Sequence, residues 1–375
     1  YYARHPSTEL LMLSYRLPDT TVDEVWDLTT GYPMPQGLND ALQDENVRIV
    51  GFNVGQFDRP VINEKLHINA PPERYIDLAA LAYHFGFAGS LDDILEAMGL
   101  GIAKDPEGRR LILKFCKLQP KNQKIRRRDR WTDPEDWERF VEYARQDITV
   151  MVALVKYLRP YRVWKPLWAQ WWIDQHINDA GLPIDNKLVV EALDIADYEK
   201  TNVLAYIGAM TGIANPNSNA QLKLWLQENG IPELENMQKE TIVKQAARTD
   251  LPDKVLLVLR AKQKIAMSSV SKYDALGRAT CADGTVKGAH QFMGASRTGR
   301  DAHRVFQPGN LPRGSIKDSP AAAEFMLQYG YDGIDLVYGN PMDTLSSVVR
   351  CTISPPEGQT LVAGDLAGIE GRVLP

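Results

Sequence analysis

The sequence has 375 residues, of which 44% are hydrophobic and 24% are charged, and its formal net charge at neutral pH is −5. A chain of this length can bury the cores of two or three domains, and the composition excludes disordered and fibrous proteins. No apolar run is long enough to cross a bilayer, so the sequence predicts no membrane partner. The three cysteines are widely spaced and not arranged as metal ligands, which favours a reducing, cytoplasmic compartment.

Both ends of the sequence favour a piece of a longer protein. The chain begins at Tyr1 rather than Met, and residues 9–17 immediately form the pattern of a buried strand. At the other end, a helical pattern stops at Pro375 after only a turn or two. Because so short a helix needs tertiary contacts to be stable, we expect an internal or truncated segment.

Residues 1–158 alternate between strand and helix patterns. Strands are predicted at 10–17, 22–27 and 47–53, and helices near 78–87 and 90–98. A long helix then runs from Asp133, a plausible N-cap, to the Pro160 that closes it. This order of elements predicts an α/β domain.

Basic residues gather at 104–130 and are densest at 124–131. In an acidic protein such a segment indicates either a surface for a polyanion or a solvated loop. Charge alone supports these two interpretations about equally.

Residues 159–180 predict a helical linker whose four tryptophans pack against neighbouring domains, namely Trp164, Trp168, Trp171 and Trp172. Residues 181–276 are mostly helical in pattern, with a turn at 215–219 and one long amphipathic helix at 256–276. The last region, 277–375, begins with a predicted hairpin turn at 282–285 that opens strands through Phe292.

Two patterns in the first region involve carboxylates and are weak when taken singly. Tyr143 and Asp147 are four apart on one helical face, which an ordinary surface pair would also explain. The strand at 47–53 ends in Asn53, and Asp58 follows where a helix starts, so that Asp58 could be only a helix cap. Strand ends are nevertheless where α/β proteins place reactive groups, and a carboxylate on a partly apolar face favours a bound cation.

Their order and separation change the interpretation. Asn-x3-Phe-Asp followed about ninety residues later by Tyr-x3-Asp resembles the second and third motifs of DEDD exonucleases with a catalytic tyrosine. The resemblance implies that Asp58 and Asp147 bind divalent metals and that Tyr143 positions the attacking water. Asn53 and Phe57 would shape the path of the substrate strand. In that family two Mg²⁺ or Mn²⁺ ions generate a hydroxide and stabilise the scissile phosphate.

The first motif of that family, Asp-x-Glu on the opening strand, is absent. Residues 133–135 and 197–199 have its spacing, but one includes a proline at a helix start and the other is helical and out of order. Residues 1–9 resemble the segment that follows this motif in phage-type polymerases, so we expect the missing pair shortly upstream. With half of the metal ligands, the chain alone is not expected to act as an exonuclease.

Later segments resemble family A DNA polymerases, in the order of that family. Residues 178–185 and 215–218 resemble the start of the polymerase domain and its thumb, although a helix cap and a turn would also explain them. Residues 294–313 resemble the segment that grips primer–template DNA, where arginines beside glycine approach phosphates closely. The resemblance implies that Arg297, Arg300 and Arg313 bind DNA. Arg300 would contact the primer end and Asn310 the template strand, while Asp301 departs from the usual Trp or Leu.

Residues 361–374 resemble polymerase motif A. An apolar strand would end in Asp365, which with the carbonyl of Leu366 would bind the catalytic metals. Glu370 would lie against the sugar of the incoming dNTP, and Arg372 would support the site. Leu366 replaces the Tyr usual in the family. The motif with the second metal carboxylate would follow and is absent, so the chain alone is not expected to polymerise DNA.

The resemblance covers nearly the whole chain and implies a fragment of a phage-type member of the bacterial DNA polymerase I family. The expected fold is an α/β RNase H-like exonuclease domain (1–158), a helical linker (159–180), an α-rich thumb (181–276) and the beginning of an α+β palm (277–375). The implied function is DNA-directed DNA synthesis with 3′→5′ proofreading in replication, on primer–template DNA and dNTP, with two Mg²⁺ or Mn²⁺ ions per site. Any replisome partners stay unidentified.

Two alternatives stay open. One is a stand-alone 3′→5′ exonuclease whose C-terminal half only binds substrate. The other is a catalytically silent, DNA-binding half of a split polymerase.

Overall fold

The computed structural model describes residues 2–87, 89–101, 107–164, 166–265, 269–295, 298–356, 358–362, 364, 367–368 and 371–372. The chain forms two compact units. Unit 1 comprises Tyr1–Ala180 and His290–Ala302, and unit 2 comprises Gly181–Ala289 and His303–Pro375. Residues 290–302 therefore lie with the N-terminal unit, although the sequence analysis assigned them to the C-terminal region.

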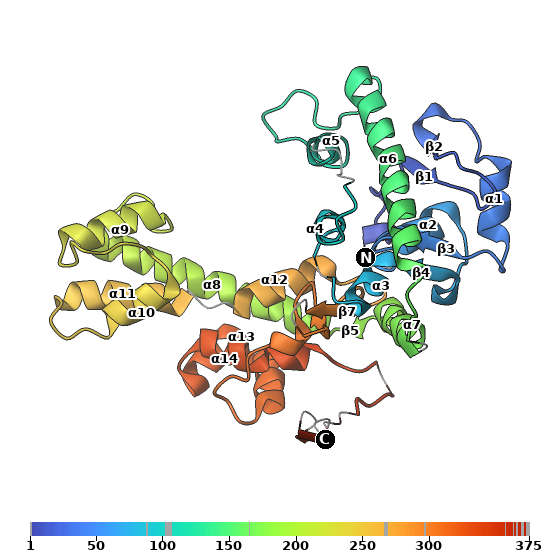
Figure 1. The fold of residues 1–375 in the computed structure, drawn as a ribbon. Helices are drawn as coiled ribbons and strands as arrows, with labels where there is room; N and C mark the ends of the chain where they lie inside the picture. The colour runs from blue at the N-terminus through green and yellow to red at the C-terminus, as the bar shows by residue number, and fades with distance from the viewer. Residues whose placement is uncertain are drawn as a thin grey trace. The chain divides into compact units, whose positions relative to one another are not determined.

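Unit 1 combines short strands with helices. Strands β1 (Met12–Tyr15) and β2 (Glu24–Asp27) pair antiparallel, β3 (Ile49–Gly51) and β4 (Tyr75–Asp77) pair parallel, and β7 (His290–Ala295) pairs with β8 (Arg300–His303). The helices are α1 (Gln36–Gln43), α2 (Asp58–Leu66), α3 (Leu78–His84), α4 (Leu91–Ala97), α5 (Gly108–Phe115), α6 (Pro134–Leu158) and α7 (Pro166–Ala180). Helix α6 lies alongside β1 and β2 (Figure 1).

The predicted α/β character of the first region is confirmed, with shorter strands than expected. The helix start expected at Asp58 is found as α2, whereas helices α1 and α5 and strand β4 were not predicted. Asp133 does occupy the N-cap position of α6, but its side chain makes no capping hydrogen bond. Instead, its carboxylate lies 2.6 Å from the ammonium of Lys114 and 3.1 Å from Arg128, because these cations offer stronger partners than a backbone amide.

Three arginines in the densest part of the basic segment are paired with carboxylates of unit 1. Arg127 lies 2.9 Å from Glu9, Arg128 pairs with Asp133, and Arg130 lies 3.3 Å from Asp27. Each exposed pair contributes little to stability, but together they neutralise charge that would otherwise face solvent. These three arginines are therefore held against the domain, whereas the exposed Lys124 and Arg126 of the same stretch form no ion pair with a described residue.

The tryptophans of residues 159–180 differ in environment. Trp171 is 2% exposed, and Trp168 and Trp172 pack against the same core beside β3 and β4. Trp164 is 54% exposed, so the prediction that all four are packing residues is wrong for this one.

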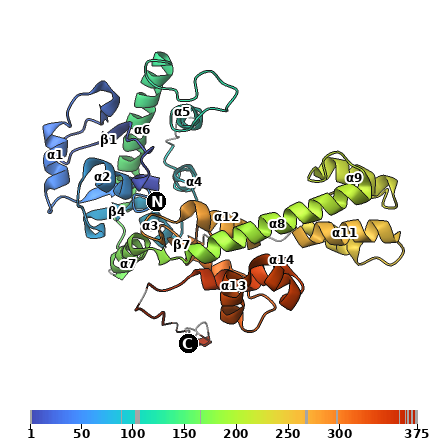
Figure 2. The same cartoon turned by 180° about the vertical axis from the view of Figure 1, so that it is seen from behind.

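Unit 2 is built mainly of helices. They are α8 (Asn186–Thr211), α9 (Asn219–Glu228), α10 (Lys239–Ala246), α11 (Asp253–Ile265), α12 (Ser269–Ala279), α13 (Ser319–Tyr338) and α14 (Pro341–Val348), with a two-residue pairing of β5 (Leu182–Pro183) and β6 (Thr285–Val286). Asp185 caps α8 by accepting a hydrogen bond from the backbone N–H of Leu188 at 3.0 Å. Helix α8 runs beside α11 (Figure 2), and its two halves belong to two separate hydrophobic clusters.

The expectations for residues 181–375 have different outcomes. Within the range expected as one helix, 256–276, the structure describes α11 and α12, and residues 266–268 lie outside the described residues. The turn at 282–285 is confirmed by the hydrogen bond from Cys281 N–H to the Thr285 carbonyl at 2.9 Å. Helices α13 and α14 were not predicted.

The apolar strand expected before Asp365 is not found among the described residues. Leu361 and Val362 are 54% and 94% exposed and belong to no strand. A strand needs a partner for its backbone groups, and none of the described strands pairs with these residues. Across the described part of the chain, every helix is too short or too polar to span a membrane.

Helix α9 contributes Leu222 and Leu226 to one hydrophobic cluster of unit 2. Leu226→Ala should lower the local stability of α9 and α11 by about 2–5 kcal/mol, because Leu226 is fully buried and its removal leaves a cavity. Leu224→Ala, on the same helix at 56% exposure, should change it by less than about 0.5 kcal/mol. Native-state hydrogen exchange measures this bundle separately from unit 1, and equal effects of the two substitutions would contradict the assigned core.

Candidate functional site

The loop between β3 and α2 is held in place by Asp77. Strands β3 and β4 are parallel, with Gly51 opposite Asp77, so their carboxyl ends lie at the same edge. The buried Asp77 carboxylate accepts hydrogen bonds from the backbone N–H groups of Asn53 at 2.8 Å and Gly55 at 3.3 Å. It also caps α3 by accepting from the N–H of Ala79 at 2.9 Å. One side chain therefore fixes two turns at this edge.

The shape of this loop also depends on backbone conformation and close packing. Asn53 has a φ of 58°, in the left-handed region that asparagine tolerates better than most residues. A Cβ atom at Gly55 would clash with the side chains of Gln175 and Trp171. The sequence Asn53-Val-Gly55 therefore allows the chain to turn tightly before α2 begins.

Asp58 is the first residue of α2, and it lies close to two other carboxylates. Burial, together with the negative charges of Asp77 and, more weakly, of Asp147, raises the pKa of Asp58 to about 7, while a backbone hydrogen bond acts in the opposite direction. Asp147 belongs to α6, almost ninety residues later in the chain. The fold thus brings Asp147 near enough to Asp58 for its charge to act on that carboxyl, as the weakest of these influences.

Tyr143, one helical turn before Asp147, is buried. Its ring lies parallel to that of Phe140 at 6.3 Å between centroids, within a cluster that also includes Phe115 and Trp137. A Cβ atom at Gly108 would clash with the Tyr143 ring, so α5 packs directly against it. The alternative interpretation of Tyr-x3-Asp was an ordinary pair on a solvated helix surface. The buried ring of Tyr143 does not fit that interpretation.

The two residues expected along the substrate strand are exposed. Asn53 lies at the surface of the loop, and Phe57 is 53% exposed while its ring stacks on Tyr2 at 5.8 Å. Within the described ranges, no three His, Cys, Asp or Glu side chains are arranged to hold a metal ion.

The residues expected to contact primer–template DNA and dNTP are divided between the two units. Arg300 is exposed on β8, where it belongs to unit 1. Asn310, at the end of a 3₁₀ helix, and Arg313 are exposed in unit 2, as is Arg372. The remaining expected site residues lie outside the described residues, namely Arg297, Asp365, Leu366 and Glu370.

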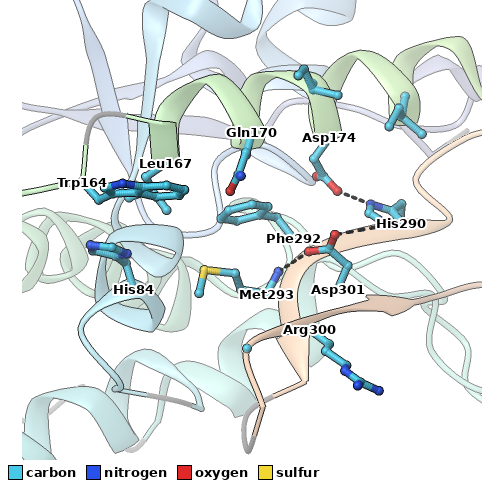
Figure 3. A pocket seen from close by; sticks show the side chains of 13 residues that line it. His84, Trp164, Leu167, Gln170, Asp174, His290, Phe292, Met293, Arg300 and Asp301 are labelled. Atoms are coloured by element: carbon cyan, nitrogen blue, oxygen red, sulfur yellow. Dashed lines mark hydrogen bonds and ion pairs between the residues drawn. The ribbon is translucent and has the colours of Figure 1, made fainter. Parts of the chain in front are cut away.

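The β7–β8 hairpin is attached to α7 by a polar network that the sequence analysis missed (Figure 3). His290 donates or accepts a hydrogen bond through Nδ1 with the buried Asp174, and its Nε2 lies 3.8 Å from Asp301. Asp301 also accepts the backbone N–H of Met293 at 2.8 Å. Burial raises the pKa of Asp174 to about 6, although the hydrogen bond and charge of His290 lower it. The departure from the family pattern at Asp301 was the sequence signal for this role.

Asp77 is the second residue that the sequence analysis missed. It is an ordinary acidic residue at the end of a short strand, and no motif marks it. Its importance follows from the register of β3 and β4, which the sequence did not predict.

Comparison with known proteins supports this organisation. Residues 24–159 match the RNase_H superfamily. Over 376 aligned residues, covering 100% of this chain, the sequence is 34% identical to a DNA polymerase from Bacillus phage SP02. The chain is homologous to a phage DNA polymerase. It spans 57% of the length of that relative.

The expected relationship to phage DNA polymerases and the RNase H-like fold of the first region are both confirmed. A solved structure of the POL domain of Pol1 from M. smegmatis, in complex with DNA primer-template and dNTP, has a TM-score of 0.43 and 15% identity to this polymerase homologue. That match covers 80% of this chain and 49% of the other, and at this score it does not define a common fold.

The raised pKa of Asp77 predicts a pH dependence of stability. Burial raises it from 3.8 to about 6, so between these values the folded state binds more protons than the unfolded state. Asp77 should therefore make unit 1 less stable as the pH rises from about 4 to 6, by up to about 3 kcal/mol. The test uses Asp58→Asn as the background, so that Asp58 does not titrate. The free energy of unfolding in urea is then measured against pH for this protein and for the double variant Asp58→Asn/Asp77→Asn. The double variant should lack this loss, and parallel pH curves would contradict the prediction.

Proposed function

We propose that this chain supplies the 3′→5′ exonuclease domain and the first part of the polymerase domain of a DNA-directed DNA polymerase that acts in replication. The observation that carries the proposal is that the charge of Asp147 acts on the carboxyl of Asp58, at positions that match two DEDD motifs. It occurs in a region matched to the RNase_H superfamily, within a chain homologous to a DNA polymerase. The activity is placed in the cytoplasm of a bacterial or phage-infected cell, for which the three free cysteines are suitable.

The chemistry of the two carboxylates fits Mg²⁺ or Mn²⁺. Carboxylate oxygens are the ligands these ions prefer, and the crowding that raises the pKa of Asp58 is what a bound cation would relieve. The ions, when bound, would activate a water molecule and stabilise charge at the scissile phosphate. Asp58 and Asp147 would hold them, and Asp77 would keep Asp58 in position by fixing the preceding loop.

Other side chains would orient the substrate and the water. Tyr143 is held rigidly by Phe140 and the close approach of Gly108, so its hydroxyl would be presented from a fixed position one turn from Asp147. The exposed Asn53 and Phe57 would guide the 3′ end of the strand toward the carboxylates.

In the polymerase part, Arg297, Arg300 and Arg313 would bind the phosphates of primer–template DNA, and Asn310 would lie along the template. Asp365 would bind a catalytic metal, while Glu370 and Arg372 would form part of the dNTP site. Support for these roles comes from motif order and from the exposure of Arg300, Asn310, Arg313 and Arg372.

Substitution of the carboxylates tests the exonuclease. The polypeptide, expressed together with any coding sequence that flanks it, should remove 3′ nucleotides from single-stranded DNA when Mg²⁺ is added. Asp58→Asn or Asp147→Asn should reduce this rate at least about 10–100-fold without reducing primer extension. Even the loss of a residue that only hydrogen-bonds to a metal ligand has an effect of about this size. Asp136→Asn is the matched control on α6, because its carboxylate is paired with Arg110 and Lys114.

The same assay separates the alternatives. Unchanged exonuclease activity in Asp147→Asn would contradict the assigned site. Nuclease activity without any primer extension would favour a stand-alone exonuclease, and DNA binding without either activity would favour a silent half of a split polymerase.

Salt dependence tests the DNA contacts. Arg300→Ala and Arg313→Ala should each weaken primer–template binding and reduce the slope of log affinity against log salt concentration by about 1, since each would release one counterion fewer. Arg248→Ala should have no such effect, because that guanidinium is paired with Glu233 at 2.8 Å and Asp250 at 2.6 Å. If both variants have the wild-type slope, Arg300 and Arg313 do not contact the DNA phosphates.

A further inference from the structure

A row of aromatic rings lies on unit 1 outside the carboxylate cluster. The ring of Tyr157, near the end of α6, lies 6.0 Å from that of Tyr161, which lies 5.5 Å from Phe85, which lies 5.1 Å from His84. The rings come from two chain segments, residues 84–85 and 157–161, so the fold rather than the helix repeat brings them together. We call these four rings the aromatic row.

The aromatic row leads to a cavity between α7 and the β7–β8 hairpin. The cavity has a volume of about 550 Å³, and His84, the last ring of the row, lines it together with Trp164, Gln170 and Phe292. Figure 3 shows the rings of Trp164 and His84 near one another at one end of this space, with Gln170 and Phe292 beside them. A cavity of this size is large enough for a planar group such as a nucleobase.

Two of these aromatic side chains are much more exposed than packing requires. Tyr161 is 51% exposed and Trp164 is 54% exposed, whereas Trp171 on the adjoining helix is 2% exposed. The amide side chain of Gln170 is also exposed, and it forms no hydrogen bond with the described residues. The cavity therefore offers ring faces for stacking and one amide for the edge of a base.

Unpaired positive charge accompanies the row. Arg159 and Arg162 flank Tyr161 in the chain, both are exposed, and neither forms an ion pair with a described residue. Three arginines of the basic segment, Arg127, Arg128 and Arg130, are by contrast paired with carboxylates. Exposed rings interleaved with free cations are typical of surfaces that bind single-stranded nucleic acid, whose bases are available for stacking.

We propose that single-stranded DNA binds along the aromatic row and places one base in the cavity beside Trp164. The inference deepens the proposed function and rests on it, because the bound strand would be the one that reaches the carboxylates on α6. Tyr157 is ten residues from Asp147 on that helix, a rise of about 15 Å, so the row lies a few nucleotides from the cluster. Duplex DNA would not bind in this way, since its bases are already stacked on each other.

Binding of a fluorescent deoxythymidine oligonucleotide, measured by anisotropy in EDTA, tests the site without cleavage. Trp164→Ala and Tyr161→Ala should each weaken binding about tenfold, while Trp164→Phe, which keeps a ring, should bind nearly as wild type. Arg162→Ala should reduce the salt slope by about 0.7, the value for one contact to a single strand. Tyr206→Ala is the control, because Tyr206 is 42% exposed on α8 of unit 2.

Photocrosslinking of the wild-type protein to an oligonucleotide that contains 5-iodouracil gives a second measurement that needs no variant. Adducts should map to Tyr161 or Trp164 by mass spectrometry, and adducts found only elsewhere would overturn the proposal. So would wild-type affinity in both alanine variants, or an equal loss in Tyr206→Ala.

The two proposals fail in different ways. Stacking-dependent binding without nuclease activity would refute the proposed exonuclease and leave the DNA surface standing. Nuclease activity that is indifferent to Trp164→Ala and Tyr161→Ala, together with unchanged affinity, would refute the surface alone.

Discussion

Repulsion between carboxylates in a partly dry site is the constraint on which the candidate centre depends. Asp58, Asp77 and Asp147 come from three different elements, and the charges of the other two disfavour the ionised form of Asp58. Asp77 accepts hydrogen bonds from the backbone N–H groups of Asn53, Gly55 and Ala79, which offset part of the effect of burial on its pKa. Asp77 can therefore act as a structural anchor, while Asp58 gains most from an external positive charge.

The loop before α2 is held by several independent interactions. A carboxylate that must stay near others of the same sign would move away if its backbone were free to do so. The loop prevents this because Asp77 binds its amides, Asn53 accepts a left-handed conformation, and Gly55 leaves no space beside Trp171. The cost of holding the charges together is thus met by hydrogen bonds and packing in the surrounding domain.

How far the sequence could predict the structure depends on the range of the interactions involved. Helix α6 and the turn at 282–285 were predictable because local signals determine them. Asp58 and Asp147 were predictable as candidates only through motif order, since neither residue has an unusual neighbourhood in the chain. The role of Asp77 depends on strand register, and the aromatic row depends on contacts between residues 84–85 and 157–161, neither of which a local pattern encodes.

The wrong expectations have the same origin. The tryptophan pattern of 159–180 predicted packing for all four rings, because helical spacing does not reveal which faces the neighbouring domain covers. Residues 361–364 have the composition of a buried strand, yet the described ones are exposed, because composition without a pairing partner does not make a sheet. For the basic residues at 124–131, the presence of an acidic partner says more about whether an arginine can bind a polyanion than the local density of positive charge does.

The β7–β8 hairpin connects these observations. Its sequence carries the arginines expected to grip DNA, yet its contacts are with α7, through His290, Asp174 and Asp301, and with the core of unit 1, through Phe292. Asp301, the residue that departs from the family pattern, holds the hairpin closed by binding the N–H of Met293. Arg300 therefore belongs to the same compact unit as the candidate exonuclease carboxylates and the aromatic row. A DNA strand that contacts Arg300 would consequently be held by the unit that also carries the nuclease residues, because the hairpin belongs to that unit.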